Sequence, residues 1–270
     1  MGIIIEEELL IEELHRNRKI RIYLPTGYEV DKTKRYPVLY MHDGQNMVDP
    51  SFFSGHSWEV QKTLEALEKS GLIDGIIVVG IDASEQYRLS EYQHFFNKGT
   101  LKYFEHEARK KGEEIPVPQA KEYGQFIVNS LKSKIDQDYR TMPEMEHTGL
   151  VGSSCGGNVS LYLLSEYPHI FGKIGVLSTA LSMISTEIFE RMEQMVLSDQ
   201  TMIYHHMGEK ETNNWVGNQY AIYLAKKLNN VLVRKCNNIK FVVGPGEIHS
   251  EVTWKERFPE FIIFAFGTKK

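Results

Sequence analysis

The sequence predicts an α/β fold in which helices cover both faces of a mostly parallel central sheet. Short apolar runs recur along the chain, separated by longer segments whose apolar residues fall at i, i+3 and i+4. This alternation is typical of βαβ units. The runs are continuously apolar rather than alternating, which is expected of strands buried on both faces.

Eight of these runs are expected to be strands. Ile3–Ile11 and Lys19–Leu24 look like an antiparallel lead-in, closed by the turn around Pro25-Thr26-Gly27. The later runs are short and continuously apolar, which favours buried strands at the centre of the sheet. These are Val38–His42, Ile76–Ile81, Thr148–Val151, Ile174–Leu177, Met202–His205 and Ile239–Val243.

Six segments between the strands have helical length and helical apolar spacing. They are Trp58–Ser70, Ala120–Asp136, Cys155–Glu166, Glu187–Leu197, Trp215–Asn229 and Glu251–Phe264. The segment Ala83–Gln119 is the exception, because it is polar, aromatic and charged, although Leu101–Lys111 could be a short helix. An insertion of this length is usually a functional cap or lid, and otherwise a disordered loop, so a cap-like insertion and a plain surface excursion both stay open.

Composition limits the classes of function. The chain has 270 residues and no Pro/Ser/Gly-rich linker, so a single domain over residues 1–270 is expected. Its net charge of −5 does not favour polyanions, and no nucleic-acid partner is expected. No apolar stretch approaches the length of a membrane span, and no export signal is visible. With only two cysteines, we expect reduced thiols in the cytoplasm.

The strongest chemical signal is Gly152-Ser153-Ser154-Cys155-Gly156, a G-x-S-x-G pattern centred on Ser154. It follows a predicted strand and opens a predicted helix. A strained strand-to-helix turn of this kind exposes a serine hydroxyl at the carboxyl edge of a sheet. We therefore expect Ser154 to be a nucleophile; the alternative is a glycine-rich turn whose Ser153 or Ser154 only caps the helix.

A serine nucleophile needs an imidazole as base and a carboxylate that orients the imidazole. In an α/β-hydrolase sheet the acid, and then the histidine, follow the serine along the chain. His249 fits because it lies between the Ile239–Val243 strand and the last helix, on the edge that carries Ser154. The alternative for His249 is a loop residue that caps this helix. The other histidines after Ser154 fit less well: His169, His205 and His206.

The acid is expected in Met207-Gly208-Glu209-Lys210-Glu211, directly after the Met202–His205 strand. A turn glycine with a carboxylate three residues later would point the acidic side chain toward the histidine loop, which favours Glu211. Glu209 is the second candidate. Two solvated loop charges, or a Ser–His dyad supported by a carbonyl, are the other interpretations.

The negative oxygen of a tetrahedral intermediate needs backbone N–H donors. We expect one from Cys155, at a helix N-terminus directly after the nucleophile, and one from Gln45, in the loop after the Val38–His42 strand. The same position at a helix N-terminus predicts a lowered pKa for the Cys155 thiol. This chemistry requires no metal and no organic cofactor.

Together these residues resemble the esterase D-type putative esterase family of the α/β-hydrolase superfamily. This family is related to feruloyl and acetylxylan esterases, siderophore esterases and S-formylglutathione hydrolase. The resemblance covers nearly the whole chain in the expected order. It rests on Tyr36-Pro37-Val38-Leu39-Tyr40, His42-Asp43-Gly44-Gln45-Asn46, Gly80-Ile81-Asp82, Arg88, Glu91-Tyr92, Ile135-Asp136, Tyr139-Arg140-Thr141, Gly152-Ser153-Ser154-Cys155-Gly156-Gly157, His249-Ser250-Glu251, Trp254 and Arg257-Phe258-Pro259.

The resemblance implies a serine carboxylesterase with Ser154 as nucleophile, His249 as base and Glu211 as acid, acting on a small-acyl or aromatic-acyl ester. S-formylglutathione hydrolase and siderophore-ester hydrolase are alternatives of the same fold. A non-catalytic binding protein is the alternative from another class. Cys155 stands where the family often has Met, and the acid is Glu where many relatives have Asp; neither departure removes a required chemical group.

Two further features accompany the resemblance. Asp82, Arg88 and Glu91 belong to the matching pattern, and we interpret them as a structural ion-pair network under the insertion. The aromatic residues of Ala83–Gln119 could wall an acyl pocket, or they could form an interface in a homo-oligomer.

Overall fold

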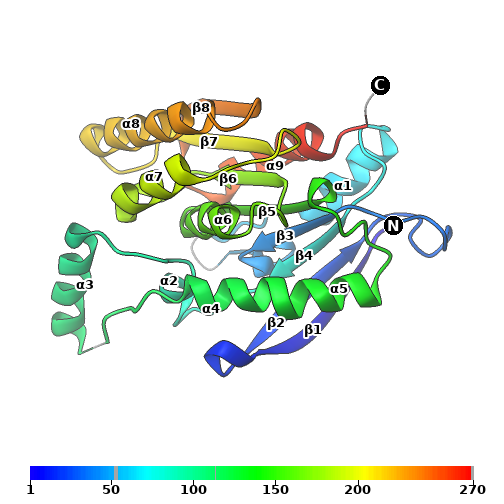
Figure 1. Ribbon diagram of the computed structural model, residues 1–270, viewed down its shortest axis with the longest axis horizontal. Helices are drawn as coiled ribbons and strands as arrows, with labels where there is room; N and C mark the ends of the chain where they lie inside the picture. The colour runs from blue at the N-terminus through cyan, green and yellow to red at the C-terminus, as the bar shows by residue number, and fades with distance from the viewer. Residues whose placement is uncertain (52–53, 113, 269–270) are drawn as a thin grey trace.

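The computed structural model describes residues 1–51, 54–112 and 114–268 (Figure 1). Its strands form one eight-stranded sheet in the order β1-β2-β4-β3-β5-β6-β7-β8. Every neighbouring pair from β4 to β8 is parallel, whereas β2 runs antiparallel to both β1 and β4. The strands are β1 (Ile3–Ile11), β2 (Arg16–Leu24), β3 (Val38–His42), β4 (Ile77–Ile81), β5 (Thr148–Ser153), β6 (Lys173–Leu177), β7 (Met202–Lys210) and β8 (Asn238–Ile248).

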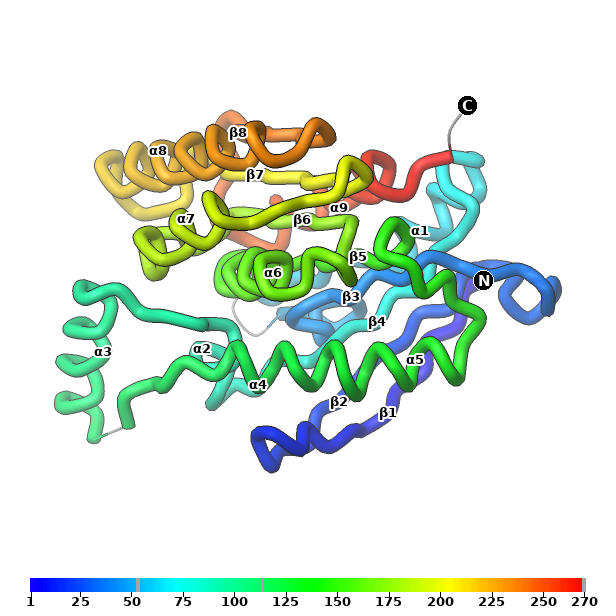
Figure 2. The backbone as a smooth tube through the Cα atoms, in the orientation of Figure 1, coloured from blue at the N-terminus to red at the C-terminus, as the bar shows by residue number. Residues whose placement is uncertain are grey.

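Helices cover both faces of this sheet, which confirms the predicted α/β architecture (Figure 2). The helices are α1 (Val60–Lys69), α2 (Arg88–Glu91), α3 (Lys98–Lys111), α4 (Ala120–Gln125), α5 (Lys132–Asp138), α6 (Cys155–Glu166), α7 (Ser185–Gln194), α8 (Trp215–Leu232) and α9 (Glu251–Phe266). A π-helical segment, Phe126–Leu131, joins α4 to α5, so the single predicted helix Ala120–Asp136 is one continuous helical run.

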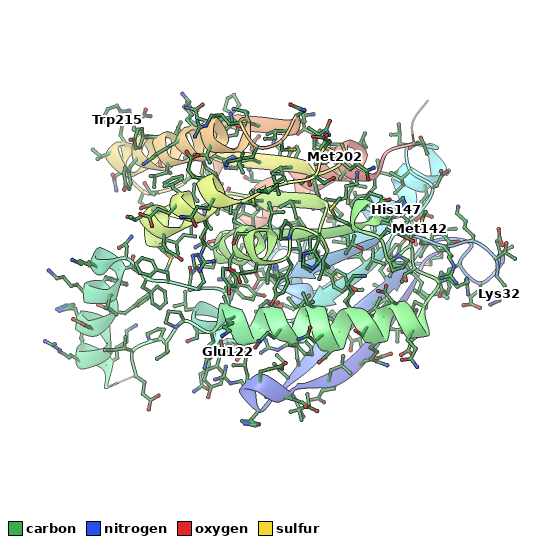
Figure 3. The ribbon with its side chains drawn as sticks, in the orientation of Figure 1. Lys32, Glu122, Met142, His147, Met202 and Trp215 are labelled. Carbon is green, nitrogen blue, oxygen red and sulfur yellow. The ribbon has the colours of Figure 1, made fainter. Side chains whose placement is uncertain are left out.

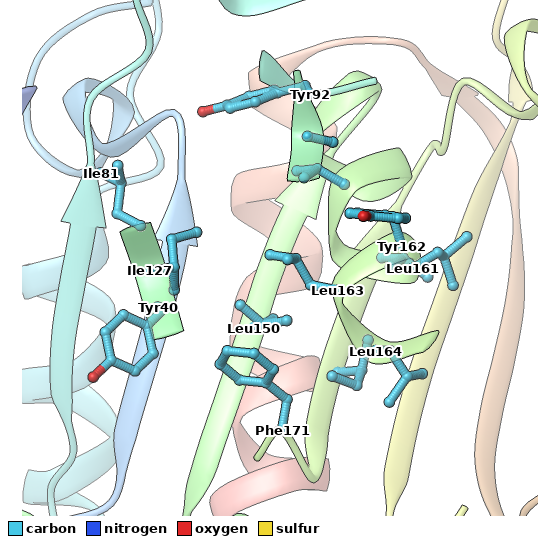
Figure 4. Close-up of a cluster of buried hydrophobic side chains, with 14 of the residues drawn as sticks. Tyr40, Ile81, Tyr92, Ile127, Leu150, Leu161, Tyr162, Leu163, Leu164 and Phe171 are labelled. Atoms are coloured by element: carbon cyan, nitrogen blue, oxygen red, sulfur yellow. The ribbon is translucent and has the colours of Figure 1, made fainter. Parts of the chain in front are cut away.

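Two hydrophobic clusters pack against the two faces. The larger cluster includes buried side chains of α4 to α8 (Figure 4), and the smaller one includes those of α1 and α9. In β3 the side chains alternate between them: Tyr40 belongs to the first cluster, while Leu39 and Met41 belong to the second. All three are fully buried, which explains why this strand is apolar without a break.

The lead-in differs from the prediction at its turn. The register of β1 against β2 runs from Ile3 opposite Leu24 to Ile11 opposite Arg16, so the hairpin closes at Glu12–Leu14. His15 completes this turn with a left-handed backbone (φ 51°). The turn around Pro25-Thr26-Gly27 instead follows β2 and leads out of the hairpin.

β7 and β8 are longer than the predicted strands Met202–His205 and Ile239–Val243. They stay paired through Met207 opposite Val243 and Gly208 opposite Gly244, and the pairing then shifts before Lys210 meets Ile248. Because of this extension, Glu211 and His249 are the first residues beyond two neighbouring strands.

The insertion Ala83–Gln119 contains α2, close to the sheet, and α3, which projects away from it (Figure 1). α3 has only one buried residue, Ala108. Asn97 caps α3 by accepting the Thr100 N–H, and its amide donates to the Ser182 carbonyl. Within the described part of the chain, no helix has the length and apolar character needed to cross a membrane.

Candidate active site

Ser154 lies between β5 and α6 in a strained backbone conformation, with φ 54° and ψ −121°. A positive φ is unfavourable for a residue that has a side chain. The turn is tight because a Cβ added to Gly152 would lie 2.4 Å from the carbonyl carbon of Gly156. Strand, strained serine and helix therefore form the elbow that the G-x-S-x-G pattern predicts.

The two expected oxyanion donors lie at the ends of neighbouring strands. Cys155 is the first residue of α6, where backbone N–H groups have no partner within the helix. Gln45 lies in the 3₁₀ turn Gly44–Met47 that follows β3, the strand next to β5. The Gln45 side chain accepts a hydrogen bond from the Ala83 N–H at 2.9 Å, which ties this turn to the start of the insertion.

The predicted lowering of the Cys155 pKa is wrong. The thiol is buried, 3.9 Å from the sulfur of Met183, and burial raises its pKa even though the nearby Arg88 opposes this shift. Loss of hydration therefore outweighs the attraction of the helix N-terminus. The side chain of Cys155 faces the interior.

His249 and Glu211 are in direct contact. His249 Nδ1 lies 2.5 Å from Glu211 Oε2, while Glu211 Oε1 accepts the backbone N–H of Gly208 at 2.5 Å. The Glu211 side chain is 5% exposed and that of His249 is 36% exposed, so the carboxylate is sheltered and the imidazole is accessible. The His249 ring also packs edge-on against Trp254, with the ring centres 5.0 Å apart. The ring is thereby oriented from two sides.

Glu209, the second candidate for the acid, has another partner. Its Oε2 accepts the Gly246 N–H at 2.7 Å, so it holds the backbone just before His249 and does not contact the imidazole. Of the alternative histidines, His205 and His206 are fully buried in β7, and His206 contacts Glu247 at 2.6 Å. His169 is exposed, in the connection from α6 to β6.

Two cavities meet at Ser154 and His249, and both residues line each of them. The polar pocket has a volume of about 220 Å³ and is lined by Asp43, Gln45, Asn46, Ser54, Arg88, Ser153, Ser154, His249, Glu251 and Trp254. The α8 pocket has a volume of about 320 Å³, and its apolar wall includes Leu181, Met207, Tyr220, Ala221 and Leu224. Ser154 therefore has space on two sides, one lined mainly by polar residues and one with a largely apolar wall.

A larger cavity of about 900 Å³ lies at the opposite edge of the sheet, where the parallel strands begin. Met142, His147 and Met202 belong to its lining, and Figure 3 shows them together on that side of the molecule. None of the expected catalytic residues lines it. Its size alone does not make it the reaction site, because it lacks a nucleophile beside a base.

Asp82, Arg88 and Glu91 each form ion pairs, either with arginines of β2 or with Asp43. Arg88 binds both carboxylate oxygens of Asp43 at 2.6 and 2.8 Å. Glu91 pairs with Arg18 at 2.8 and 2.9 Å, and Asp82 pairs with Arg21 at 2.9 Å. The pairs join the start of the insertion to the sheet and its turns, as a structural network would.

Several pocket residues were not singled out from the sequence. Glu251 accepts a hydrogen bond from the Ser51 hydroxyl at 2.6 Å, and Asn46 has a buried side-chain oxygen with no partner among the described residues. Asp43 and Asn46 lie within two residues of Gln45, and Glu251 follows His249 by two residues. All three belong to the quoted family motifs, which were the available signal, although no role was predicted for them. Within the described ranges, no group of three or more His, Cys, Asp or Glu residues could hold a metal ion.

Comparison with known proteins places this chain in a family. A family model described as "Putative esterase" matches residues 11–265. The chain belongs to this esterase family. Membership confirms the family resemblance that the motifs predicted.

Individual relatives of this esterase are distant. YbbA of Bacillus subtilis is 24% identical over 178 residues, and the match spans 63% of this chain and 59% of YbbA. An IroE-like serine hydrolase from Shewanella oneidensis superposes with a TM-score of 0.75 at 21% identity, covering 98% of this chain and 80% of that one. A ferulic acid esterase from Anaeromyces mucronatus gives a TM-score of 0.69 at 17% identity, covering 98% and 91%. These structural similarities confirm the α/β-hydrolase fold.

Proposed function

We propose that this esterase is a serine carboxylesterase in which Ser154 is the nucleophile, His249 the general base and Glu211 the acid that orients it. The observation that carries the proposal is the 2.5 Å contact between His249 Nδ1 and Glu211 Oε2 at the wall of two pockets that also contain Ser154. Because Nδ1 faces the acid, Nε2 is the ring nitrogen left for the serine hydroxyl.

The reaction has two acyl-transfer steps. His249 Nε2 takes the Ser154 proton as Oγ bonds to the ester carbonyl carbon, and the imidazolium then gives this proton to the alcohol oxygen as the C–O bond breaks. Water repeats the sequence on the acyl-serine and releases the acid and free Ser154. Glu211 stays ionised throughout and stabilises the imidazolium.

The carbonyl oxygen becomes negative in each tetrahedral intermediate. The backbone N–H groups of Cys155 and Gln45 are proposed to receive it, since both lie at the carboxyl edge of the sheet beside Ser154. The N-terminus of α6 adds a favourable field for this negative charge. No cofactor takes part in the proposed steps.

The proposed substrate is a small-molecule ester with a small or an aromatic acyl group. Pockets of about 220 and 320 Å³ suit groups of this size on either side of the scissile bond. The fold shared with a ferulic acid esterase supports including aromatic acyl groups. Comparing p-nitrophenyl acetate, p-nitrophenyl butyrate and methyl ferulate would rank the two kinds of acyl group.

The decisive experiment replaces the nucleophile. Ser154→Ala should lower kcat for p-nitrophenyl acetate by at least about 10³-fold, because removal of a triad serine eliminates the covalent route. Ser160→Ala is the matched control, since this buried serine lies about 1.7 turns further along the chain in α6 and its hydroxyl donates to the Gly156 carbonyl. A fluorophosphonate probe should label wild type and Ser160→Ala but not Ser154→Ala. Full activity of Ser154→Ala would refute the assignment, and an unlabelled wild type would favour a non-catalytic binding protein.

A further inference from the structure

Asp43, the residue between β3 and the turn that carries Gln45, has an unfavourable backbone. Its φ is 55° and its ψ is 50°, the left-handed region that a residue other than glycine rarely adopts. Such a conformation persists only where the surroundings hold it, and it is frequent at functional sites. Asp43 is also buried, with 4% of its surface exposed.

Two residues of the insertion hold Asp43 in this conformation. Arg88 donates from Nε and Nη2 to the two carboxylate oxygens, at 2.6 and 2.8 Å, and thereby fixes the plane of the side chain. The backbone N–H of Asp43 donates to the hydroxyl oxygen of Tyr92 at 2.9 Å. Tyr92 is fully buried and lies at the carboxyl end of β5 in Figure 4. Side chain and backbone of Asp43 are thus held from the same short segment.

That segment is itself anchored to the sheet. Glu91, between Arg88 and Tyr92, accepts two hydrogen bonds from Arg18 of β2 at 2.8 and 2.9 Å. The guanidinium of Arg18 is buried, so this pair is sheltered from water. α2 therefore connects β2 to the turn after β3, through Glu91 on one side and Arg88 on the other.

The turn beyond Asp43 has little freedom to adjust. A Cβ on Gly44 would lie 2.4 Å from the backbone of Gly80 in β4, so the turn lies directly against that strand. The Asn46 N–H donates to the Asp43 carbonyl at 2.9 Å. This hydrogen bond closes the turn around Gln45 and fixes the residues on either side of it. The orientation of the Gln45 N–H therefore depends on the conformation of Asp43.

We propose that Arg88 and Tyr92 are positioning residues of the esterase, which hold Asp43 left-handed and so aim the Gln45 N–H at the oxyanion. The proposal rests on the function proposed above. It gives the insertion a role in the reaction that does not require α3 to cover the site. Neither residue needs to touch the substrate, because both act through Asp43.

Tyr92→Phe tests the proposal with a minimal change. It removes only the hydroxyl, which accepts the Asp43 N–H and also contacts the Tyr123 hydroxyl, so the packing of the buried ring is preserved. We expect kcat for p-nitrophenyl acetate to fall on the order of tenfold with KM changed less than about twofold, because a displaced donor weakens binding of the transition state and not of the substrate. Tyr204→Phe is the matched control: Tyr204 is also fully buried, and its hydroxyl donates to Glu260 at 2.7 Å, away from the site.

A second measurement separates positioning from general destabilisation. Ser154 Oγ adds to the carbonyl carbon of a trifluoromethyl ketone while its proton passes to His249, and the ketone oxygen becomes an oxyanion that faces the same donors. The inhibition constant should therefore rise in Tyr92→Phe by the same factor as kcat/KM falls. Arg88→Lys should show the same parallel loss, since one ammonium group cannot reproduce the two-bond contact with Asp43.

The outcomes are distinct. Wild-type kcat in both variants, or an equal loss in Tyr204→Phe, would overturn the proposal, as would a fall in kcat with unchanged trifluoromethyl ketone binding. If Arg88→Lys does not fold, Tyr92→Phe alone decides. Failure of the proposed function would look different, because wild type would then neither hydrolyse the ester nor react with the fluorophosphonate.

Discussion

Glu209 and Glu211 stand two residues apart at the end of β7, and they contact different parts of the segment 246–249. Glu211 contacts the imidazole of His249, while Glu209 accepts a backbone N–H from Gly246. A carboxylate next to the imidazole favours its charged form during catalysis, whereas one on the backbone only holds the loop in place. Exchanging each acid for its amide separates the two contributions.

We expect Glu211→Gln to lower kcat by about 10²- to 10⁴-fold, because the amide cannot stabilise the imidazolium and can hold the wrong tautomer. Glu209→Gln keeps a carbonyl oxygen that can still accept the Gly246 N–H, so kcat should stay within about threefold of wild type. Steady-state kinetics on p-nitrophenyl acetate would measure both. Equal losses in the two variants would show that Glu211 acts only through the loop.

Several site residues could be found from the sequence because each occupies a recognisable place relative to a strand. Ser154 lies in a motif, and Glu211 and His249 follow apolar runs on the expected edge. The state of the Cys155 thiol could not be found in this way, because it depends on packing against Met183, 28 residues away. The contact between Asp43 and Arg88, 45 residues apart, was hidden for the same reason.

At the scale of elements, strand ends were harder to place than strand centres. β3 and α6 agree with prediction at both ends, whereas β7 and β8 run several residues further than their apolar stretches. Gly244-Pro245-Gly246 suggests a turn, yet Gly208 still pairs with Gly244. Pairing with a neighbouring strand decided the structure of this segment, and a single sequence does not contain that information.

α3 contributes few contacts to the core, and this leads to a prediction about stability. Replacing residues 98–111 by an eight-residue Gly/Ser linker should change the free energy of unfolding by only about 1 kcal/mol, because Ala108 is the one buried residue of the helix. The linker reaches about 26 Å, enough for the roughly 21 Å that a 14-residue helix spans. Urea denaturation would measure the change.

A substitution in α7 gives the contrast to this replacement. Ile188→Ala truncates a fully buried side chain and should cost about 2–5 kcal/mol. A comparable loss from the α3 replacement would mean that α3 is an integral part of the packed structure.

For the whole molecule, the fold class followed from the sequence because apolar periodicity reports burial directly. Strands covered on both faces are apolar without interruption, as in β3 and β4, where every residue is buried. A single domain with a cap-like insertion stays a prediction, and one cooperative unfolding transition would support it. The homo-oligomer considered from the sequence also stays a prediction.

The molecule should lose stability in acid because of histidines buried without charge. Burial lowers the pKa of His205 to about 3, and neither of its ring nitrogens has a hydrogen-bond partner among the described residues. An unfolded histidine has a pKa near 6.5, so the unfolded state binds the proton first as pH falls. The stabilisation that comes from keeping His205 uncharged is complete above about pH 6.5 and is lost as pH falls toward 3. The free energy of unfolding should fall by up to about 1.4 kcal/mol per pH unit in this range.

His205→Leu should remove this contribution. Urea denaturation at several pH values between 6.5 and 4 gives the free energy of unfolding as a function of pH. The slope of this dependence should be smaller in the variant than in wild type, by an amount that corresponds to the uptake of up to one proton on unfolding. His42, whose pKa burial lowers to about 4, would still contribute in the variant. Parallel curves for the two proteins would contradict the role of His205.

The proposed catalytic groups are divided along the chain by the insertion, with Gln45 before α3 and Ser154, Glu211 and His249 after it. In the sheet, however, β3 from the first part lies directly beside β5 from the second. A chain cut within α3 would thus yield two fragments, one with the proposed nucleophile and one with half of its oxyanion hole. Ester turnover would then report the reassembly of the two fragments, which makes this projecting helix a natural place to divide the protein into a complementation reporter.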